Sequence, residues 1–322
     1  MALWGEKTIL DFRFKISDFM YQIIQKRNWL FALSIVILVP GIIALATWGL
    51  RLGIDFTGGS LVDLEFTANR PDTVAIQEVV TKSSVGEAQL QTKGDKEVVL
   101  RLPHLSNDQH QKLVGDLRAK FKDVEERSYE TIGPTIGQEL RNQSVTLTIL
   151  VLVFIVAYIA WSFRRVSRGP VKSWAYGLAA VIALIHDLFV VVGIFAILGH
   201  YFNIELDSLF VTALLTVLGF SVHDTIVVFD RIRERIGLSA SKSFEDLVNE
   251  SLNQTLVRSL NTSLTTLLVL FALYLFGGES IKNFTLALLI GITSGTYSSI
   301  FVAAALLVVW YNWKQKPGVR KM

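Results

Sequence analysis

The sequence predicts an α-helical membrane bundle of six transmembrane helices, with one external α+β domain between helices 1 and 2. The first observation is that six apolar stretches are long enough to cross a bilayer, which takes about 20 residues of helix. These stretches cover residues 30–50, 143–163, 173–198, 208–229, 256–276 and 284–310. The second is that residues 51–141, between the first two stretches, form the one sizeable polar segment.

The overall composition agrees with a membrane protein. Of the 322 residues, 51% are hydrophobic and 18% are charged, whereas soluble domains average about 25% charged residues. The chain has no cysteine, which excludes disulfides, thiol nucleophiles and thiolate metal sites. The small formal net charge of +3 gives no indication of a nucleic-acid partner. We expect no cofactor and no metal centre.

Residues 1–29 are predicted to be a cytoplasmic amphipathic segment. The polar lead is too long for a cleaved signal, and no A-x-A-like site follows the apolar run. Its apolar residues recur at helical spacing, which predicts a short helix on the membrane surface; they are Ile16, Phe19, Met20, Ile23 and Ile24. The alternative is that these residues are simply an amphipathic segment leading into helix 1, which differs little from a surface helix. Pro40 is expected to kink helix 1.

The segment 51–141 contains sequence patterns typical of strands and helices, and their order along the chain can be assigned. Alternation predicts strands, a polar N-cap before apolar helical spacing predicts helices, and Lys93-Gly94-Asp95 predicts a hairpin. The predicted elements are strand 60–66, helix 72–83, strands 86–92 and 96–102, helix 106–121 and strand 123–132. This order, βαββαβ, is that of a ferredoxin-like sandwich.

The distribution of positive charge predicts the orientation of the remaining bundle, residues 142–310. Lys and Arg outside the polar domain gather before helix 1, in the loops 164–172 and 230–255 and in the tail 311–322. Connections 199–207 and 277–283 together carry one, Lys282. The positive side of a membrane protein is cytoplasmic. Both termini are therefore expected in the cytoplasm and 51–141 outside, in the periplasm or its equivalent.

Two of the apolar stretches each carry one acidic residue. Such a residue costs at least ~2.5 kcal/mol in a spanning helix and is a functional-site hypothesis by default. Asp224, in 208–229, either pairs locally and determines packing or titrates on an ion or proton route. Its candidate partner is Arg258, at the start of the fifth helix. The alternative for Arg258 is that its side chain reaches the lipid head groups.

The second acid, Asp187, lies near the middle of stretch 173–198, and each acid follows a histidine, His186 or His223. Neighbouring helix positions point about 100° apart, so one such pair is no chelate. Two pairs on adjacent helices leave a metal cluster as an alternative, but nothing else supplies ligands. Packing or a proton relay is favoured for the histidines. The predicted relay is Asp224, Arg258, Asp187, His223 and His186.

Other motifs are assigned structural roles or surface positions. Gly219, Gly291 and Gly295 are expected to permit close helix packing. Glycines 53, 58 and 59 lack the spacing and the lysine of a phosphate loop, so a nucleotide site is not expected. The acids and arginines after helix 4 form a predicted cytoplasmic surface cluster, Asp230, Arg231, Arg233 and Glu234. One helical face in 244–255 is expected to lie against the membrane or a partner: Phe244, Leu247, Val248, Ser251, Leu252 and Thr255.

Five stretches together resemble the SecF branch of the SecD/SecF family. They are LGIDFTGGS (52–60), ALIHDLFVVVGI (183–194), GFSVHDTIVVFDRIRE (219–234), SLNQTLVRSLNTSLTT (251–266) and GITSGTYSSIFVA (291–303). The motif after helix 1 comprises Asp55, Phe56, Thr57, Gly58 and Gly59. The placing of one external domain after helix 1, followed by five helices, also resembles that family.

The resemblance implies a non-enzymatic subunit of a bacterial plasma (inner) membrane translocase. It implies pairing with SecD as a heterodimer, association with the SecYEG channel, with YajC and YidC as further partners, and use of the proton-motive force to draw exported polypeptides across after SecA has acted. The family's essential transmembrane Asp and Arg fall on Asp224 and Arg258. The family commonly has Asn before that Asp, and here His223 adds a titratable group.

The sequence leaves two alternatives to a protein-export function. The family resembles the membrane halves of RND exporters, which makes a proton-driven exporter of small molecules or lipids an alternative, although 51–141 is far smaller than the substrate-binding domains of those proteins. The second alternative is a passive scaffold of the channel, which predicts that Asp224 can be neutralised without loss. No hydrolase, kinase or redox constellation stands out in the sequence.

Overall fold

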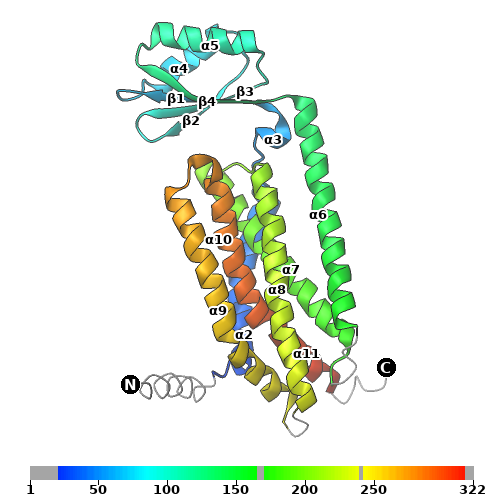
Figure 1. The fold of residues 1–322 in the computed structure, drawn as a ribbon. Coiled ribbons are helices and arrows are strands. Elements are labelled where there is room, and N and C mark those ends of the chain that lie inside the picture. Colours follow the sequence, from blue (N-terminus) through cyan, green and yellow to red (C-terminus); the bar gives the residue numbers. More distant parts are fainter. Residues whose placement is uncertain (1–20, 165–169, 239–241, 316–322) are drawn as a thin grey trace, which may run out of the picture. The chain divides into compact units, whose positions relative to one another are not determined.

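The computed structural model describes residues 21–164, 170–238 and 242–315 (Figure 1). The chain forms two compact units. We call residues Arg51–Ile149 together with Glu205–Val211 the sandwich unit, and the remaining described residues the helical unit. The predicted domain 51–141 lies within the sandwich unit, which also includes residues 142–149 and 205–211.

Six helical segments in the described chain are long and apolar enough to span a membrane, as the sequence predicts: Ile24–Trp48, Pro134–Phe163, Ser173–Phe202, Ser208–Gly237, Phe244–Phe276 and Glu279–Gln315. The corresponding elements are η1 (Ile24–Lys26), α2 (Arg27–Trp48), α6 (Pro134–Phe163), α7 (Ser173–Phe202), α8 (Ser208–Leu238), α9 (Phe244–Phe276), η2 (Glu279–Ile281), α10 (Lys282–Tyr297), η3 (Ser298–Ala303) and α11 (Ala304–Gln315). The last span is interrupted by η3, a π-helix between α10 and α11.

Several helices extend beyond the apolar stretches that predict them. Helix α6 begins at Pro134, where the fixed φ of proline suits a first helical position. Helix α8 continues through the charged cluster to Leu238. Helix α9 begins at Phe244, after the N-cap Ser243. The predicted loop 230–255 is therefore mostly helix, because hydropathy marks the part that crosses the membrane and charged residues continue a helix without penalty.

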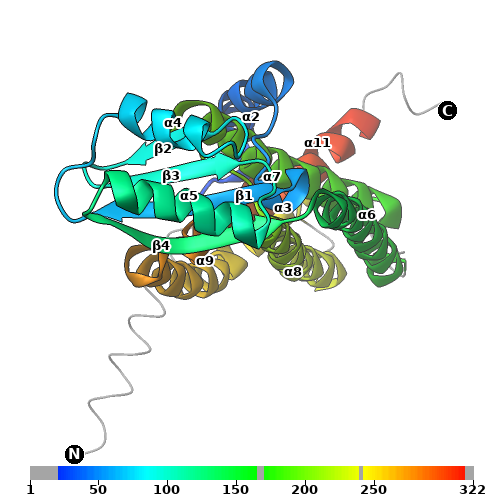
Figure 2. The same ribbon diagram turned by 90° about the horizontal axis from the view of Figure 1, so that it is seen from above.

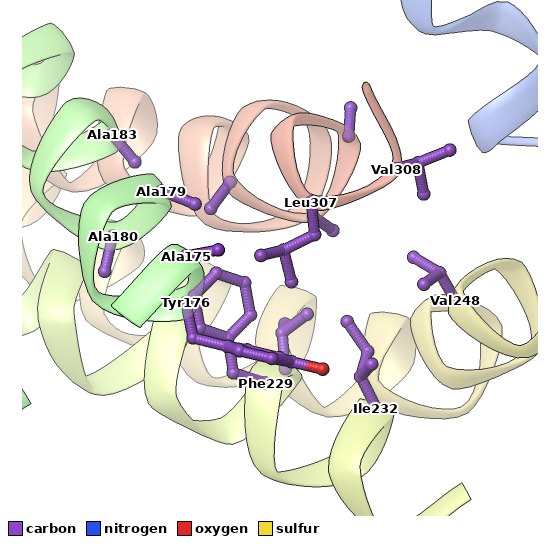
Figure 3. Close-up of a cluster of buried hydrophobic side chains, with 14 of the residues drawn as sticks. Ala175, Tyr176, Ala179, Ala180, Ala183, Phe229, Ile232, Val248, Leu307 and Val308 are labelled. Atoms are coloured by element: carbon purple, nitrogen blue, oxygen red, sulfur yellow. The ribbon is translucent and has the colours of Figure 1, made fainter. Parts of the chain in front are cut away.

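The start of α9 belongs to the core of the helical unit. All six residues of its predicted apolar face are buried, and three of them join a cluster with α7, α8 and α11: Phe244, Val248 and Leu252. Figure 3 shows the small side chains of α7, among them Ala179, beside Leu307 of α11. The rings of Tyr176 and Phe229 meet edge to face at 5.4 Å. This face thus packs within the chain itself.

The predicted surface helix at the N-terminus falls largely in residues 1–20, outside the described chain. The described part begins beside α9, where Asn249 Oδ1 accepts hydrogen bonds from Ile23 N at 2.9 Å and Ile24 N at 3.3 Å. Arg27, the first residue of α2, forms an ion pair with Glu245. Asn249 and Glu245 therefore attach the start of α2 to the start of α9.

The sandwich unit contains a four-stranded antiparallel sheet with strand order β2-β3-β1-β4. In chain order its elements are β1 (Gly59–Phe66), α4 (Thr73–Lys82), β2 (Gln89–Lys93), β3 (Glu97–Leu102), α5 (Asn107–Lys120) and β4 (Val124–Ile132). Helices α4 and α5 cover one face of the sheet (Figure 2). The βαββαβ order and the ferredoxin-like topology predicted from the sequence are confirmed.

Local sequence signals explain these elements. Every second residue of β1 is fully buried against the two helices, beginning with Val62 and ending with Phe66. Asp72 caps α4 by accepting a hydrogen bond from Val74 N. Ser106 and Gln109 form a reciprocal capping box at the start of α5, which satisfies two backbone donors at once.

Candidate functional site

Asp187 is placed inside the helical unit by the small-residue face of α7. Alanines at helical spacing bring this face of α7 into the core, and the same face continues to His186 and Asp187. The side chain of Asp187 is 0% exposed. A fully buried carboxylate requires hydrogen-bond donors around it, since an unpaired buried charge is strongly unfavourable.

Three serine hydroxyl groups supply those donors. Ser221 of α8 and Ser298 of η3 each donate to Asp187 Oδ2 at 2.6 Å, and Ser294 of α10 donates to Oδ1 at 2.8 Å. We call Asp187 with these three serines the hydroxyl cage. It joins four elements of the bundle, because its members come from α7, α8, α10 and η3.

Glycines on α10 make the hydroxyl cage possible. A Cβ atom on Gly291 would lie 2.2 Å from Val217 Cγ2, and one on Gly295 would lie 3.0 Å from Ser221 Cβ. The two predicted packing glycines thus allow α10 to approach α8 closely. Gly219 differs from them, because no atom of the described chain lies within 4 Å of its added Cβ. A second close approach, Gly41 against Gly193, joins α2 to α7.

His186 contributes to the same site in a way that the helix geometry did not predict. Its Nδ1 lies 3.0 Å from Asp187 Oδ1, although the two residues are neighbours on one helix. Rotation about the side-chain bonds lets adjacent residues meet even when their Cα–Cβ vectors diverge. The other ring nitrogen, Nε2, is buried and has no hydrogen-bond partner among the described residues.

Asp224 lies in a different environment on α8. Its side chain is 3% exposed, and its Oδ2 is buried without a hydrogen-bond partner in the described chain. The next residue, Thr225, shares a hydrogen bond with Ser299 of η3 at 2.8 Å, and Ser299 also donates to the carbonyl of Ser221 at 3.1 Å. These hydroxyl contacts hold α8 against η3 beside Asp224 without including its carboxylate.

Arg258 and His223 are both exposed on the helical unit. Arg258 is the only charged residue in the sequence from Ser251 to Phe276, and within the described chain it forms no ion pair with Asp224. The predicted pair of Asp224 and Arg258 is therefore not brought together within this chain. His223 is next to Asp224 on α8, but its side chain is exposed whereas that of Asp224 is buried.

The two histidine–aspartate pairs do not converge on a metal site. Across residues 21–164, 170–238 and 242–315, no group of three or more His, Asp or Glu side chains is arranged to hold an ion. The predicted surface cluster at the end of α8 is partly internally paired. Arg231 contacts Glu234 and donates to Gln254 of α9 at 2.7 Å, so this charge cluster also ties α8 to α9.

The motif after α2 has a structural role in the sandwich unit. Ile54–Thr57 form the short helix α3, in which Phe56 is buried. Gly58 and Gly59 follow with φ angles of 70° and 130°, a region that favours glycine. A Cβ on Gly58 would lie 2.8 Å from Pro134 Cα, at the start of α6. The two glycines therefore allow β1 to begin directly beside α6.

Two carboxylates of the sandwich unit cap the N-terminus of α8. Asp55 Oδ2 accepts a hydrogen bond from Ser208 N at 2.8 Å, and Asp207 Oδ1 accepts one from Phe210 N at 2.8 Å. Burial raises the pKa of Asp207, the bond from Phe210 lowers it, and the nearby charge of Asp55 raises it again, with a net upward shift. Carboxylates at this position satisfy orphan N–H groups and complement the helix dipole.

Sequence reasoning missed the serines of the hydroxyl cage. The spacing of Gly291 and Gly295 indicates helix packing, whereas nothing in the expectations above makes Ser294 and Ser298, one helical turn apart, partners of Asp187. A signal was present, because hydroxyl residues at one-turn spacing in an apolar helix are suitable donors to a carboxylate on a neighbouring helix. Ser221, three residues before Asp224 on α8, was also missed as a donor to Asp187.

Comparison with known proteins gives consistent matches. A family model described as protein export membrane protein SecD/SecF, C-terminal, matches residues 113–313, and one described as the SecD/SecF GG motif matches residues 43–69. The chain is 47% identical to the protein translocase subunit SecF of Thermobaculum terrenum, with 91% of this chain and 95% of that protein covered. It is 40% identical to the subunit of the same name from Anaerolinea thermophila, with 90% and 94% covered.

A solved structure is also similar. The crystal structure of SecDF from Thermus thermophilus, described as a translocon-associated membrane protein, matches with a TM-score of 0.79 and 33% identity. The match covers 92% of this chain and 39% of that one.

Proposed function

This chain belongs to the SecD/SecF family of protein-export membrane proteins, and from that premise we propose that it couples the proton-motive force to polypeptide export as a subunit of the Sec translocase. It acts with SecD on chains that pass through SecYEG after SecA has acted. It lies in the bacterial inner membrane with both termini in the cytoplasm and the sandwich unit outside. The relatives it matches are named as a translocase subunit and not as an enzyme.

The observation that carries this proposal is the unpartnered oxygen of Asp224. A buried carboxylate that lacks a donor or cation is unfavourable when ionised, and one with a cation beside it is stabilised. Asp224 Oδ2 has no partner in the described chain, whereas both oxygens of Asp187 accept hydrogen bonds. Asp224 is thus the carboxylate whose protonation a change of surroundings can switch.

We assign the changing partner of Asp224 to the assembled complex. Arg258 lies exposed on this chain within an otherwise uncharged part of α9. A guanidinium in a spanning helix normally faces a protein interior or a water-filled cavity, so its face is proposed to meet SecD. Docking of SecD on this face would remove water from Arg258 and change the distance between Arg258 and Asp224. His223, the neighbour of Asp224 in the sequence, is a second titratable group in this region.

The energies involved are of matching size. Moving one elementary charge across the membrane potential supplies ~2.3 kcal/mol per 100 mV. Breaking a buried ion pair by removing one partner costs about 3–5 kcal/mol. In the assembled complex, where Arg258 is proposed to be the counter-ion of Asp224, protonation of Asp224 leaves Arg258 unpaired. The energy of one proton is comparable with this cost, so protonation favours a shift of α9 relative to α8.

The test uses inverted vesicles that contain the chain with SecD, and measures the increase in export that a proton gradient produces. Asp224→Asn is expected to abolish that increase, and Arg258→Lys to reduce it, since a point charge does not reproduce the guanidinium fork. Asp230→Asn is the matched control, because this acid lies on the same helix with its side chain 70% exposed. Full stimulation of the Asp224→Asn vesicles would refute the proton role and favour a passive scaffold.

The proposed orientation has a separate test. Because the sequence has no cysteine, a single one can be introduced as Asp95→Cys, in the β2–β3 turn. A membrane-impermeant thiol reagent added outside spheroplasts should label it. A cysteine in place of Arg233, near the end of α8, should be labelled from the cytoplasmic side alone. The reverse pattern would overturn the orientation.

A further inference from the structure

The segment that follows α2 is hydrogen-bonded to the connection between α7 and α8. Gly53 N donates to Leu206 O at 2.8 Å, and Leu206 N donates to Arg51 O at 2.8 Å. These bonds make a parallel bridge between Leu52 and Leu206. A Cβ on Gly53 would lie 2.9 Å from Leu206 O, so the glycine permits the close approach.

An arginine from the sheet completes this connection. Arg101 of β3 forms an ion pair with Glu205, and its Nη2 donates to Leu52 O and to Thr57 Oγ1, each at 3.0 Å. Glu205 is also 3.4 Å from Arg51 Nε. Hydrogen bonds that involve charged groups are the stronger ones in proteins. Arg101 thereby holds β3, α3 and the α7–α8 connection together.

The connection ends at the first turn of α8. Asp55, in α3, accepts the Ser208 N–H, which has no acceptor within its own helix because it belongs to the first turn. We call these contacts the clasp: the Leu52–Leu206 bridge, the Arg101–Glu205 pair and the Asp55–Ser208 bond. All of its members belong to the sandwich unit. Helix α8 begins in the clasp and continues along the chain to Asp224.

We propose that the clasp couples α8 to the sandwich unit, so that displacement of α8 moves the sheet and its helices as one body. Arg101 and Asp55 are its positioning residues. Covalent continuity already ties the unit to the ends of α2 and α6, and the clasp adds the helix that carries the proposed proton site. This inference rests on the proposed function of Asp224 and adds the route by which protonation reaches the domain outside the membrane.

The first experiment measures the clasp without any transport assay. Hydrogen exchange on the full chain in lipid nanodiscs should show protected amides at Gly53, Leu206 and Ser208. Arg101→Ala should accelerate their exchange about tenfold, as expected when a charged hydrogen-bonded group is lost. Arg127→Ala is the matched control, because Arg127 pairs on the sheet with Glu65 and Glu97 outside the clasp. Unchanged exchange in Arg101→Ala would refute the clasp.

The second experiment tests coupling in the vesicle assay with SecD. Arg101→Ala should lose most of the gradient-dependent export, and Arg127→Ala should retain it. Partners in a β-bridge lie close enough for a disulfide, so Leu52→Cys with Leu206→Cys, when oxidised, should restore export to Arg101→Ala. The disulfide only keeps the clasp closed and supplies no positive charge. If it restores export to Arg101→Ala, the role of Arg101 is to position the clasp.

The outcomes separate this inference from the proposed function. Full export by Arg101→Ala, with its clasp amides exchanging fast, would overturn the coupling and leave the proton role of Asp224 intact. An oxidised Leu52→Cys/Leu206→Cys chain that is inactive until reduced would also overturn it, since the clasp would then have to open. Full stimulation of Asp224→Asn together with loss in Arg101→Ala would refute the proton role and leave the clasp as a coupling element.

Discussion

The two intramembrane aspartates of the helical unit are equally well buried and differently surrounded. Asp187 accepts hydrogen bonds from three serines on three elements. Asp224, also on a spanning helix, leaves one buried oxygen without a partner in the described chain. Burial alone therefore does not identify the switching group. Donors that satisfy a carboxylate make it a structural centre, and the lack of them leaves Asp224 as the acid that we propose to switch.

This difference assigns distinct consequences to mutation at the two positions. The hydroxyl cage is complete within one chain, so damage to it should appear as lost stability. The surroundings of Asp224 are incomplete, so damage there should appear in export. His186 belongs to the first environment, since its Nδ1 contacts Asp187, and we expect its role in a relay to depend on that contact.

The largest expected effect comes from removing the centre of the hydroxyl cage. Asp187→Ala leaves three buried hydroxyl groups without their acceptor, at about 1–3 kcal/mol for each group left unsatisfied. We expect a loss of 3 kcal/mol or more in total, by the same estimate. Thermal unfolding of the purified chain in detergent measures it, with Asp224→Ala as the matched control. Equal destabilisation by the two substitutions would break the comparison.

A smaller loss is expected from crowding the interface that supports the cage. Gly291→Ala places a Cβ 2.2 Å from Val217 Cγ2, and overpacking of this kind typically costs about 1–3 kcal/mol. The melting temperature should fall for this variant. Gly219→Ala, at a position whose added Cβ meets no described atom within 4 Å, should be neutral or stabilising. A similar fall for both alanines would show that close approach of α10 is unimportant.

An isosteric pair of substitutions sharpens the contrast between the two aspartates. In Asp187→Asn one carboxylate oxygen becomes an amide nitrogen, which cannot accept from Ser221 and Ser298 as Oδ2 does. In Asp224→Asn no hydrogen bond of Oδ2 is lost. We expect about 1–3 kcal/mol of destabilisation for the first and less than about 1 kcal/mol for the second. Chemical unfolding of both variants side by side decides the point.

The smallest effect concerns a carboxylate outside the spanning helices. Burial raises the pKa of Asp63 above its ordinary value, and the charge of Glu97 adds to this, while Lys93 and Arg127 act in the opposite sense. An acid with a raised folded-state pKa contributes stability at low pH that is lost as the pH rises through that pKa. Protection of the β1 amides should therefore fall as the pH rises above about 4, the ordinary pKa of an aspartate, by comparison with Asp63→Asn. Parallel pH profiles would contradict the partly buried environment of Asp63.

Local patterns in the sequence were enough for the spans and for the sandwich. The six apolar stretches, the alternation in β1 and the caps at Asp72 and Ser106 each act over a few residues, so they can be recognised without tertiary contacts. The ends of helices were less predictable, as the continuation of α8 to Leu238 shows. An apolar run in the sequence marks the part of a helix that lies in the lipid. The helix can continue into water when the residues that follow are charged residues with good helix propensity, so its end is not marked by hydropathy.

The sequence by itself determined that Asp187 and Asp224 would lie within spanning helices, because each is the single acid of a long apolar run. Only the tertiary structure decided which of them is satisfied. The donors to Asp187 come from residues 34, 107 and 111 positions away in the chain, and Asp55 reaches Ser208 across 153 positions. Such partners depend on how helices pack, and the packing depends on glycines and serines whose spacing is compatible with several neighbours.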